Sequence, residues 1–223
     1  MEKIKTIIFD LDNTLIDFWK MKEEAARSAI RAMIKVGLKA DEADAYRKFM
    51  ITYKRVGIES QNAFQEFLKS EVGRIDEKML AAAINAYLKT KDSFMKPYPS
   101  VKPTLHDLKK RKIKLAIVTD APKVKAYQRL LAMNIEKYFD FVIGFEDTEK
   151  RKKTEIPLKA AIEKLKLNPN EIMVVGDSIK RDIIPARKLD MISVFAKYGS
   201  SEKVEKIKPD FEINDFSDIL KIV

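Results

Sequence analysis

The stretch Ile4-Lys5-Thr6-Ile7-Ile8-Phe9-Asp10-Leu11-Asp12-Asn13-Thr14 decides the fold of this chain. Its first part is mostly apolar and β-branched, which is typical of a strand buried inside a parallel sheet. Polar residues follow at once, and Asp10 and Asp12 stand two positions apart. If extended geometry continues past the strand, both carboxylates lie on the same side of the chain. The stretch therefore predicts a buried strand over residues 4–10 that delivers two acids to its exit.

Beyond residue 96, short apolar runs alternate with segments of helical spacing. We expect strands at about 114–119, 140–144, 171–176, 191–196 and 210–213, and helices at about 101–112, 123–134, 155–166 and 180–189. This alternation favours right-handed βαβ units and an α/β fold whose parallel sheet is covered on both faces. Strand 4–10 belongs to that sheet.

The segment between the first strand and the rest of the sheet has a different pattern. Apolar residues recur three and four positions apart, with a Gly, Asp or Ser near the ends of each run, so the segment predicts a small helical bundle. The expected helices are about 18–36, 41–56, 60–72 and 76–92. We therefore predict a core domain of residues 1–16 and 96–223 and an inserted helical domain of residues 17–95.

Composition limits the chemistry that is available. The chain of 223 residues has 46% hydrophobic residues, no cysteine and one histidine. The hydrophobic content predicts an ordered globule. The absence of cysteine excludes disulfides and thiolate chemistry, and with a single histidine it also excludes zinc sites built from Cys or several His. Any bound metal must be held by oxygen. The apolar stretches are short and broken by charge, so we expect a soluble, cytoplasmic protein without a membrane partner.

The formal net charge of +10 raises the alternative of a non-catalytic protein that binds nucleic acid or phosphate. Nucleic-acid binding needs clustered Lys and Arg, whereas the basic residues here are spread along the chain and usually sit beside acids. We therefore expect no nucleic-acid partner.

Polar residues also end two of the later predicted strands. Thr119-Asp120 follows Ala116-Ile117-Val118, and Gly176-Asp177-Ser178 follows Met173-Val174-Val175. In open α/β sheets ligands bind at the carboxyl ends of the strands, so these residues and Asp10 should share one site. The backbone N–H of Asp120 precedes a predicted helix, which together with the Thr119 hydroxyl suits a phosphoryl group.

Acidic residues at these exits fit a magnesium-dependent reaction at phosphorus. One of the two acids of the first exit can attack phosphorus while the other protonates the leaving oxygen and later activates water. Mg²⁺ prefers oxygen ligands, and Asp177 is the expected direct ligand. Asp182 either holds a metal-bound water or orients Lys153. Ser178 is either a helix N-cap or a contact in the site.

The basic run Lys150-Arg151-Lys152-Lys153 precedes a predicted helix. One ammonium group from this run can lie against the phosphate and Asp10, where a cation keeps the nucleophile ionised. As a run of charge alone, it favours a solvated surface.

These residues resemble the motifs of the haloacid dehalogenase-like hydrolase superfamily over nearly the whole chain. Phe9 to Leu15 resembles the first motif, Ile117-Val118-Thr119-Asp120 the second, and Val174 to Ser178 with Asp182 the fourth. The resemblance implies a Rossmann-like core with an inserted helical cap of the C1 type. The third motif departs from the family pattern Lys-Pro-x-Pro, since Lys153 is followed by Thr154-Glu155-Ile156-Pro157.

The resemblance implies a role for each residue of the site. Asp10 is the expected nucleophile, Asp12 the general acid and base, and Thr119 a phosphate ligand. The expected ligands of Mg²⁺ are the side chains of Asp10 and Asp177 and the backbone carbonyl of Asp12. Asp182 is expected to lie next to these ligands without contacting the ion directly. The catalytic lysine is assigned to Lys153, with Lys152 as the alternative.

Asp12 favours phosphatase over dehalogenase, because a phosphate ester needs a proton on its leaving group and a carbon–halogen bond does not. The pattern is most similar to archaeal small-molecule phosphatases, which makes glyceraldehyde 3-phosphate a candidate substrate and phosphoglycolate another. A phosphotransferase, a mutase and a 2-haloacid dehalogenase are the alternatives within the superfamily. The expected partner is a small phosphate ester, and the chain is expected to be a monomer or a homodimer.

Overall fold

The structure is a computed structural model that describes residues 3–57, 60–202 and 207–223. The chain divides into two compact units, one of Met1–Phe18 with Lys96–Val223 and the other of Trp19–Met95. The first unit contains the sheet, and the second is built from helices. These boundaries differ by two residues or fewer from the domain limits proposed from the sequence.

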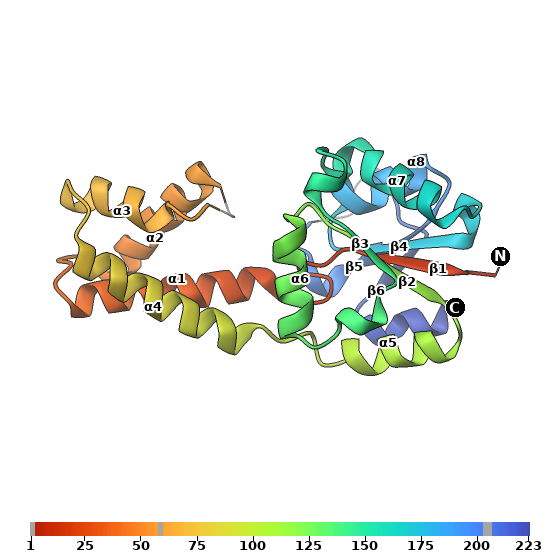
Figure 1. Cartoon of the computed structure of the whole chain (residues 1–223), viewed down its shortest axis with the longest axis horizontal. Coiled ribbons are helices and arrows are strands. Elements are labelled where there is room, and N and C mark those ends of the chain that lie inside the picture. Colours follow the sequence, from red (N-terminus) through yellow and green to blue (C-terminus); the bar gives the residue numbers. More distant parts are fainter. Residues whose placement is uncertain (1–2, 58–59, 203–206) are drawn as a thin grey trace. The chain divides into compact units, whose positions relative to one another are not determined.

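The first unit is organised around a six-stranded parallel sheet with the order β3-β2-β1-β4-β5-β6 (Figure 1). The strands are β1 (Thr6–Phe9), β2 (Lys114–Val118), β3 (Phe141–Ile143), β4 (Ile172–Gly176), β5 (Ile192–Ala196) and β6 (Phe211–Ile213). In register, Phe9 lies beside Ile117 on one side and Val175 on the other. The exits of β1, β2 and β4 therefore meet at the same edge.

Helices cover both faces of this sheet, with α7 and α8 on one side and α5 on the other (Figure 1). The helices of this unit are α5 (Val101–Lys110), α6 (Lys123–Ala132), α7 (Ile156–Leu165) and α8 (Ile184–Lys188), with a final 3₁₀ segment, η7 (Phe216–Lys221). Ile8 and Val174 share one apolar core with Leu158 of α7 and Ala186 of α8. On the other face, the ring centroids of Phe9 and Phe216 are 5.3 Å apart. Burial of both faces explains why the strands are apolar throughout.

The second unit packs its helices around aromatic side chains. The helices are α1 (Phe18–Lys35), α2 (Glu42–Val56), α3 (Ala63–Val72) and α4 (Glu77–Phe94). Phe49 of α2 stacks on Phe64 of α3 with centroids 4.9 Å apart and meets Phe67 edge to face. Asp41 and Asp76 cap α2 and α4 through their side chains, which explains the acids at these helix starts.

The predicted α/β fold with its parallel sheet is confirmed, and each predicted strand has its counterpart. One expected helix is different. Residues 179–183 form a single π-helical segment, η5 (Ile179–Ile183), before α8 begins. Pro185 has no N–H to donate to the carbonyl four residues earlier, so a regular α-helix cannot run unbroken through this region. Among residues 3–57, 60–202 and 207–223, no helix has the length and apolar character needed to cross a bilayer.

Candidate active site

The site begins at the exit of β1, where Asp10 is 4% exposed. Its backbone N–H donates to the carbonyl of Val175 at 2.9 Å, which continues the pairing of β1 with β4 beyond the last strand residue. Its Oδ1 accepts a hydrogen bond from Nζ of Lys152, a side chain that is 2% exposed. A buried carboxylate therefore faces a buried ammonium group at the carboxyl edge of the sheet.

Three carboxylates gather at this point. Oxygens of Asp10, Asp177 and Asp182 lie within 4.8 Å of one another, and all three residues are buried. Asp182 accepts from Nζ of Lys152 at 2.6 Å through Oδ1 and from the backbone N–H of Ser178 at 3.0 Å through Oδ2. Both oxygens of Asp182 are thus engaged by the protein.

Crowding of negative charge changes the titration of the cluster. Burial, followed by the charges of Asp10 and Asp182, raises the pKa of Asp177 above its ordinary value. Burial also raises the pKa of Asp182, although the Lys152 charge opposes that shift. For Lys152, burial alone would lower the pKa, but Asp10 and Asp182 outweigh it and keep the ammonium charged. The carboxylates of the cluster therefore disfavour one another's ionised forms, although Arg181 and Lys152 oppose this effect at Asp177.

The lysine in the site is Lys152, and Lys153, which the sequence analysis preferred, is exposed. The two residues lie in a short 3₁₀ segment, η3 (Lys152–Thr154). Neighbouring side chains of a 3₁₀ helix point about 120° apart, so only one of two consecutive lysines can face the acids. The sequence does not reveal the phase of this turn, so it could not show which of the two lysines faces the acids.

Asp12 has a partner that the sequence analysis missed. Its Oδ2 accepts from Nη1 of Arg129 at 2.9 Å, and Arg129 is 5% exposed although it is charged. The guanidinium also lies 4.5 Å from the ring centroid of Phe18. Arg129 belongs to α6, where its neighbours Ala126 and Leu130 are buried. An arginine on the apolar face of a helix was the available signal, because such a charge is seldom buried without a partner.

The exit of β2 carries Thr119 and Asp120 as predicted. Thr119 is buried, and its Oγ1 accepts from the backbone N–H of Ala121 at 3.2 Å. The hydroxyl hydrogen of Thr119 is then available to a ligand oxygen. Asp120 uses its side chain: its Oδ1 accepts from the backbone N–H of Lys152 at 2.8 Å.

The loop after β1 is held in shape by residues that follow β4 and β5. Asn13 has a left-handed backbone with φ of 62°, and its side-chain amide donates to Oδ2 of Asp177 at 3.4 Å. Tyr198 donates its hydroxyl to the carbonyl of Thr14 at 2.7 Å. Gly199 lies so close to Asn13 that a Cβ at position 199 would overlap the Asn13 carbonyl oxygen. Only glycine fits at 199 without moving the loop that carries Asp10 and Asp12.

The turn after β4 is equally close-packed. A Cβ on Gly176 would collide with the side chain of Asp182, so the glycine leaves room for this acid behind Asp177. Ser178 is the N-cap of η5, since its Oγ accepts from the backbone N–H of Arg181 at 3.3 Å. That hydroxyl donates to Glu202 at 2.7 Å. The capping alternative for Ser178 therefore describes the contact that is present.

The carboxylate cluster fits a hard divalent cation. Oδ1 of Asp177 is buried and finds no hydrogen-bond donor within the part of the chain that the structure describes. Nη2 of Arg181 lies 3.6 Å from this oxygen. Because the donors are all carboxylate oxygens and Asp182 is already engaged, Asp10 and Asp177 are the side chains best suited to hold Mg²⁺.

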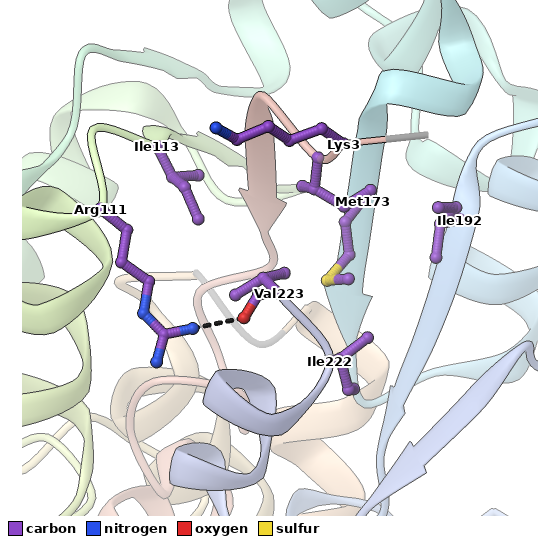
Figure 2. Close-up of a pocket in the computed structure, with 8 residues that line it drawn as sticks. Lys3, Arg111, Ile113, Met173, Ile192, Ile222 and Val223 are labelled. Atoms are coloured by element: carbon purple, nitrogen blue, oxygen red, sulfur yellow. Dashed lines mark hydrogen bonds between the residues drawn. The ribbon is translucent and has the colours of Figure 1, made fainter. Parts of the chain in front are cut away.

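A cavity of about 560 Å³ lies at the opposite edge of the sheet, near the amino ends of the strands. Figure 2 shows Arg111 donating to the carbonyl of Val223 beside it. Its lining consists of Lys3, Ile4, Arg111, Ile113, Met173, Ile192, Ile222 and Val223. None of these described lining residues carries a carboxylate side chain, so the chemistry belongs at the other edge.

A parallel sheet with acids at the exits of its central strands is typical of α/β enzymes that bind ligands at that edge. Residues 7–196 match the family model described as haloacid dehalogenase-like hydrolase. The chain is 34% identical to the glyceraldehyde 3-phosphate phosphatase of Methanopyrus kandleri and 32% identical to that of Methanocaldococcus jannaschii. Each match covers 99% of this chain and 97% of the relative.

Among solved structures, a predicted phosphoglycolate phosphatase from Haemophilus somnus is 27% identical and superposes with a TM-score of 0.68. That match covers 100% of this chain and 99% of the other. The chain belongs to the haloacid dehalogenase-like hydrolase family. Its full-length relatives place it among the phosphatases of that family.

Proposed function

We propose that this phosphatase is a Mg²⁺-dependent phosphomonoesterase that acts on a small phosphorylated metabolite through an aspartyl-phosphate. The observation that carries the proposal is the buried Asp10 carboxylate in contact with the Lys152 ammonium at the exit of the central strand. The ionised form of a carboxylate attacks phosphorus, and the adjacent ammonium group lies where it can offset the charge of the reacting groups.

In the first step a carboxylate oxygen of Asp10 forms a bond to phosphorus while the bond from phosphorus to the ester oxygen breaks. Asp12, in its acid form, donates a proton to that departing oxygen, so an alcohol leaves and an acyl phosphate remains on Asp10. Lys152 and the Thr119 hydroxyl donate hydrogen bonds to the phosphoryl oxygens. Asp10 and Asp177 would hold Mg²⁺, which when bound would offset the negative charge of the phosphoryl group.

In the second step the ionised Asp12 takes a proton from water, and the water oxygen attacks phosphorus. The bond between phosphorus and Asp10 then breaks, which releases inorganic phosphate and restores both acids. Arg129 donates to Oδ2 of Asp12 and is proposed to orient this side chain in both steps.

The helical unit of residues 19–95 is proposed to act as the cap that excludes water and selects the substrate. Glyceraldehyde 3-phosphate is the first candidate substrate, because two full-length relatives carry that activity in their names. Phosphoglycolate is the second, from the name of the Haemophilus somnus protein.

The test is phosphate release by the purified full chain with Mg²⁺, measured on triose, glycolate, sugar and nucleotide phosphates. We expect turnover of at least one small ester and none by Asp10→Asn. Asp190→Asn is the matched control, because Asp190 is exposed and its left-handed backbone, with φ of 56°, suits asparagine.

A second measurement addresses the intermediate. Acid quenching during turnover of a labelled ester should leave phosphate on the protein in a form that hydroxylamine releases, as expected for an acyl phosphate. Wild-type protein that hydrolyses no ester of the panel in the presence of Mg²⁺ would remove the basis of the proposal. Turnover without any protein-bound phosphate would contradict the covalent mechanism alone.

A further inference from the structure

The side chain of Asp120 connects two loops of the site. Its Oδ1 accepts the backbone N–H of Lys152 at 2.8 Å, across 32 positions of sequence. Its Oδ2 is buried and meets no hydrogen-bond donor among the residues described, while Nη1 of Arg181 lies 4.0 Å away. The side chain is 9% exposed. Such a carboxylate is held in the interior chiefly by the backbone of the lysine segment.

The lysine segment contains little regular structure. Residues 150–156 include no proline, so none of their φ angles is fixed by a ring. The regular part is one short turn, η3 (Lys152–Thr154), followed by Glu155 with a left-handed φ of 59°. Yet the Lys152 side chain must carry its charge into the interior, where only a narrow set of backbone positions brings Nζ to both Asp10 and Asp182.

We propose that Asp120 is a positioning residue that fixes the backbone of Lys152 and thereby sets the ammonium group against Asp10. A hydrogen bond from N–H to a carboxylate is stronger than one between neutral groups, and burial strengthens it further. A displacement of about 1 Å at a catalytic group can lower the rate roughly 100-fold. Loss of the single hydrogen bond between Asp120 and the Lys152 amide is therefore expected to lower the rate measurably. The inference rests on the proposed function, since it assigns Lys152 to the phosphoryl-transfer site.

The contact itself is tested without turnover, by amide hydrogen exchange resolved at Lys152. Asp120→Ala should speed exchange of the Lys152 amide by about tenfold or more, while the Asp10 amide, bonded to Val175, keeps its protection. Asp120→Asn retains the Oδ1 acceptor and should keep Lys152 protected. Unchanged exchange at Lys152 in Asp120→Ala would overturn the proposal.

The functional consequence is tested by a double-mutant cycle on an aryl phosphate. Asp120→Ala should lower kcat by roughly 100-fold in the wild-type background and by less than about twofold in the Lys152→Met background. Asp120→Asn should keep kcat within about threefold of wild type. The same loss in both backgrounds would overturn the proposal, because Asp120 would then act directly on the substrate. An Asp120→Asn variant as impaired as Asp120→Ala would also overturn it, since the ion pair with Arg181 would then be the relevant contact.

If Asp120→Ala does not fold, Asp120→Ser replaces it, because a serine hydroxyl is too short to reach the Lys152 amide. The exchange measurement also keeps this test separate from that of the proposed function. If wild-type protein hydrolyses no ester, the proposed function fails, and the exchange rate of the Lys152 amide still decides whether Asp120 anchors the segment.

Discussion

At the scale of single residues, the site depends on which of two adjacent lysines faces the acids. Lys152→Met should lower kcat/KM by roughly 100-fold to 1,000-fold, because it removes a buried donor from the developing negative charge. Lys153→Met is the matched control in the same turn, and it should stay within about twofold because Lys153 is exposed. Steady-state kinetics on one phosphate ester compare the two variants. Equal losses in both would contradict the assignment of Lys152.

Arg129 allows a second test at this scale, because it contacts the proposed proton carrier. Arg129→Met should lower kcat/KM for an alkyl phosphate by about tenfold, since a loosened Asp12 delivers its proton less well to the departing oxygen. The kcat/KM for 2,4-dinitrophenyl phosphate, which like the first value reports only the steps up to departure of the leaving group, should change by less than about twofold, because that leaving group needs no proton. Arg129→Lys should recover part of the loss. If both esters slow equally, Arg129 supports the loop as a whole and has no particular effect on Asp12.

Three polar residues of the candidate site could be predicted from sequence because each follows a recognisable strand. Asp10, Thr119 and Asp177 stand at the exits of β1, β2 and β4, where the topology of a parallel sheet brings them together. Lys152 and Arg129 approach from a short turn and a helix, and no strand sets the direction of their side chains. Their placement depends on the phase of a turn and on the packing of α6, which the pattern of apolar residues does not reveal.

At the scale of elements, Asp210 joins the start of β6 to β5. Its Oδ2 accepts from the backbone N–H of Ser193 at 2.9 Å and from the Ser193 hydroxyl at 2.6 Å, and Arg187 pairs with Oδ1. Burial alone would raise the pKa of Asp210, but the Ser193 hydrogen bonds and the Arg187 charge outweigh it and lower the pKa. The ionised form is therefore the one that stabilises the edge of the sheet.

The sign of the pH dependence follows from that shift. Because the pKa is lower in the folded state, the stabilisation is fully present above the unfolded value near 4 and disappears as pH falls through the folded value. Asp210→Asn should lower the free energy of unfolding by about 1 kcal/mol at pH 7, a small value because the side chain is partly exposed. Urea unfolding between pH 7 and pH 3 should bring the two proteins together at the acidic end. A constant difference across that range would rule out the ionised carboxylate as the cause.

At the scale of the whole molecule, we expect Mg²⁺ binding at the acidic cluster to stabilise the folded protein. Mg²⁺ at about 100 times its Kd should raise the free energy of unfolding by about 2.7 kcal/mol, because a ligand that binds only the folded state stabilises it. Thermal unfolding measures the shift without any substrate. Asp177→Asn should remove most of it, whereas Glu163→Gln, a change at an exposed acid, should not. An equal shift in wild type and Asp177→Asn would place the ion elsewhere.

The architecture was more predictable than the site. Apolar runs of five or six residues between helical segments define a parallel sheet, because both of its faces are buried. The π-helical segment η5 was not predicted, since the residues from Ile179 to Ile183 show the same apolar spacing as an ordinary helix. The close approach of Gly199 to Asn13 was equally hidden, because it joins positions that are distant in sequence.

The central position of β1 in the sheet affects when the active site can form during synthesis and folding. β1 is the first strand of the chain, but Thr6 pairs with Lys114 and with Ile172, so its neighbours are made much later. Asp10, the proposed nucleophile, is synthesised long before Lys152 and Asp177. Contacts of such long range slow folding, and they also delay completion of the site until most of the chain exists. A chain truncated before Lys152 would contain Asp10 without the groups that are proposed to make it reactive.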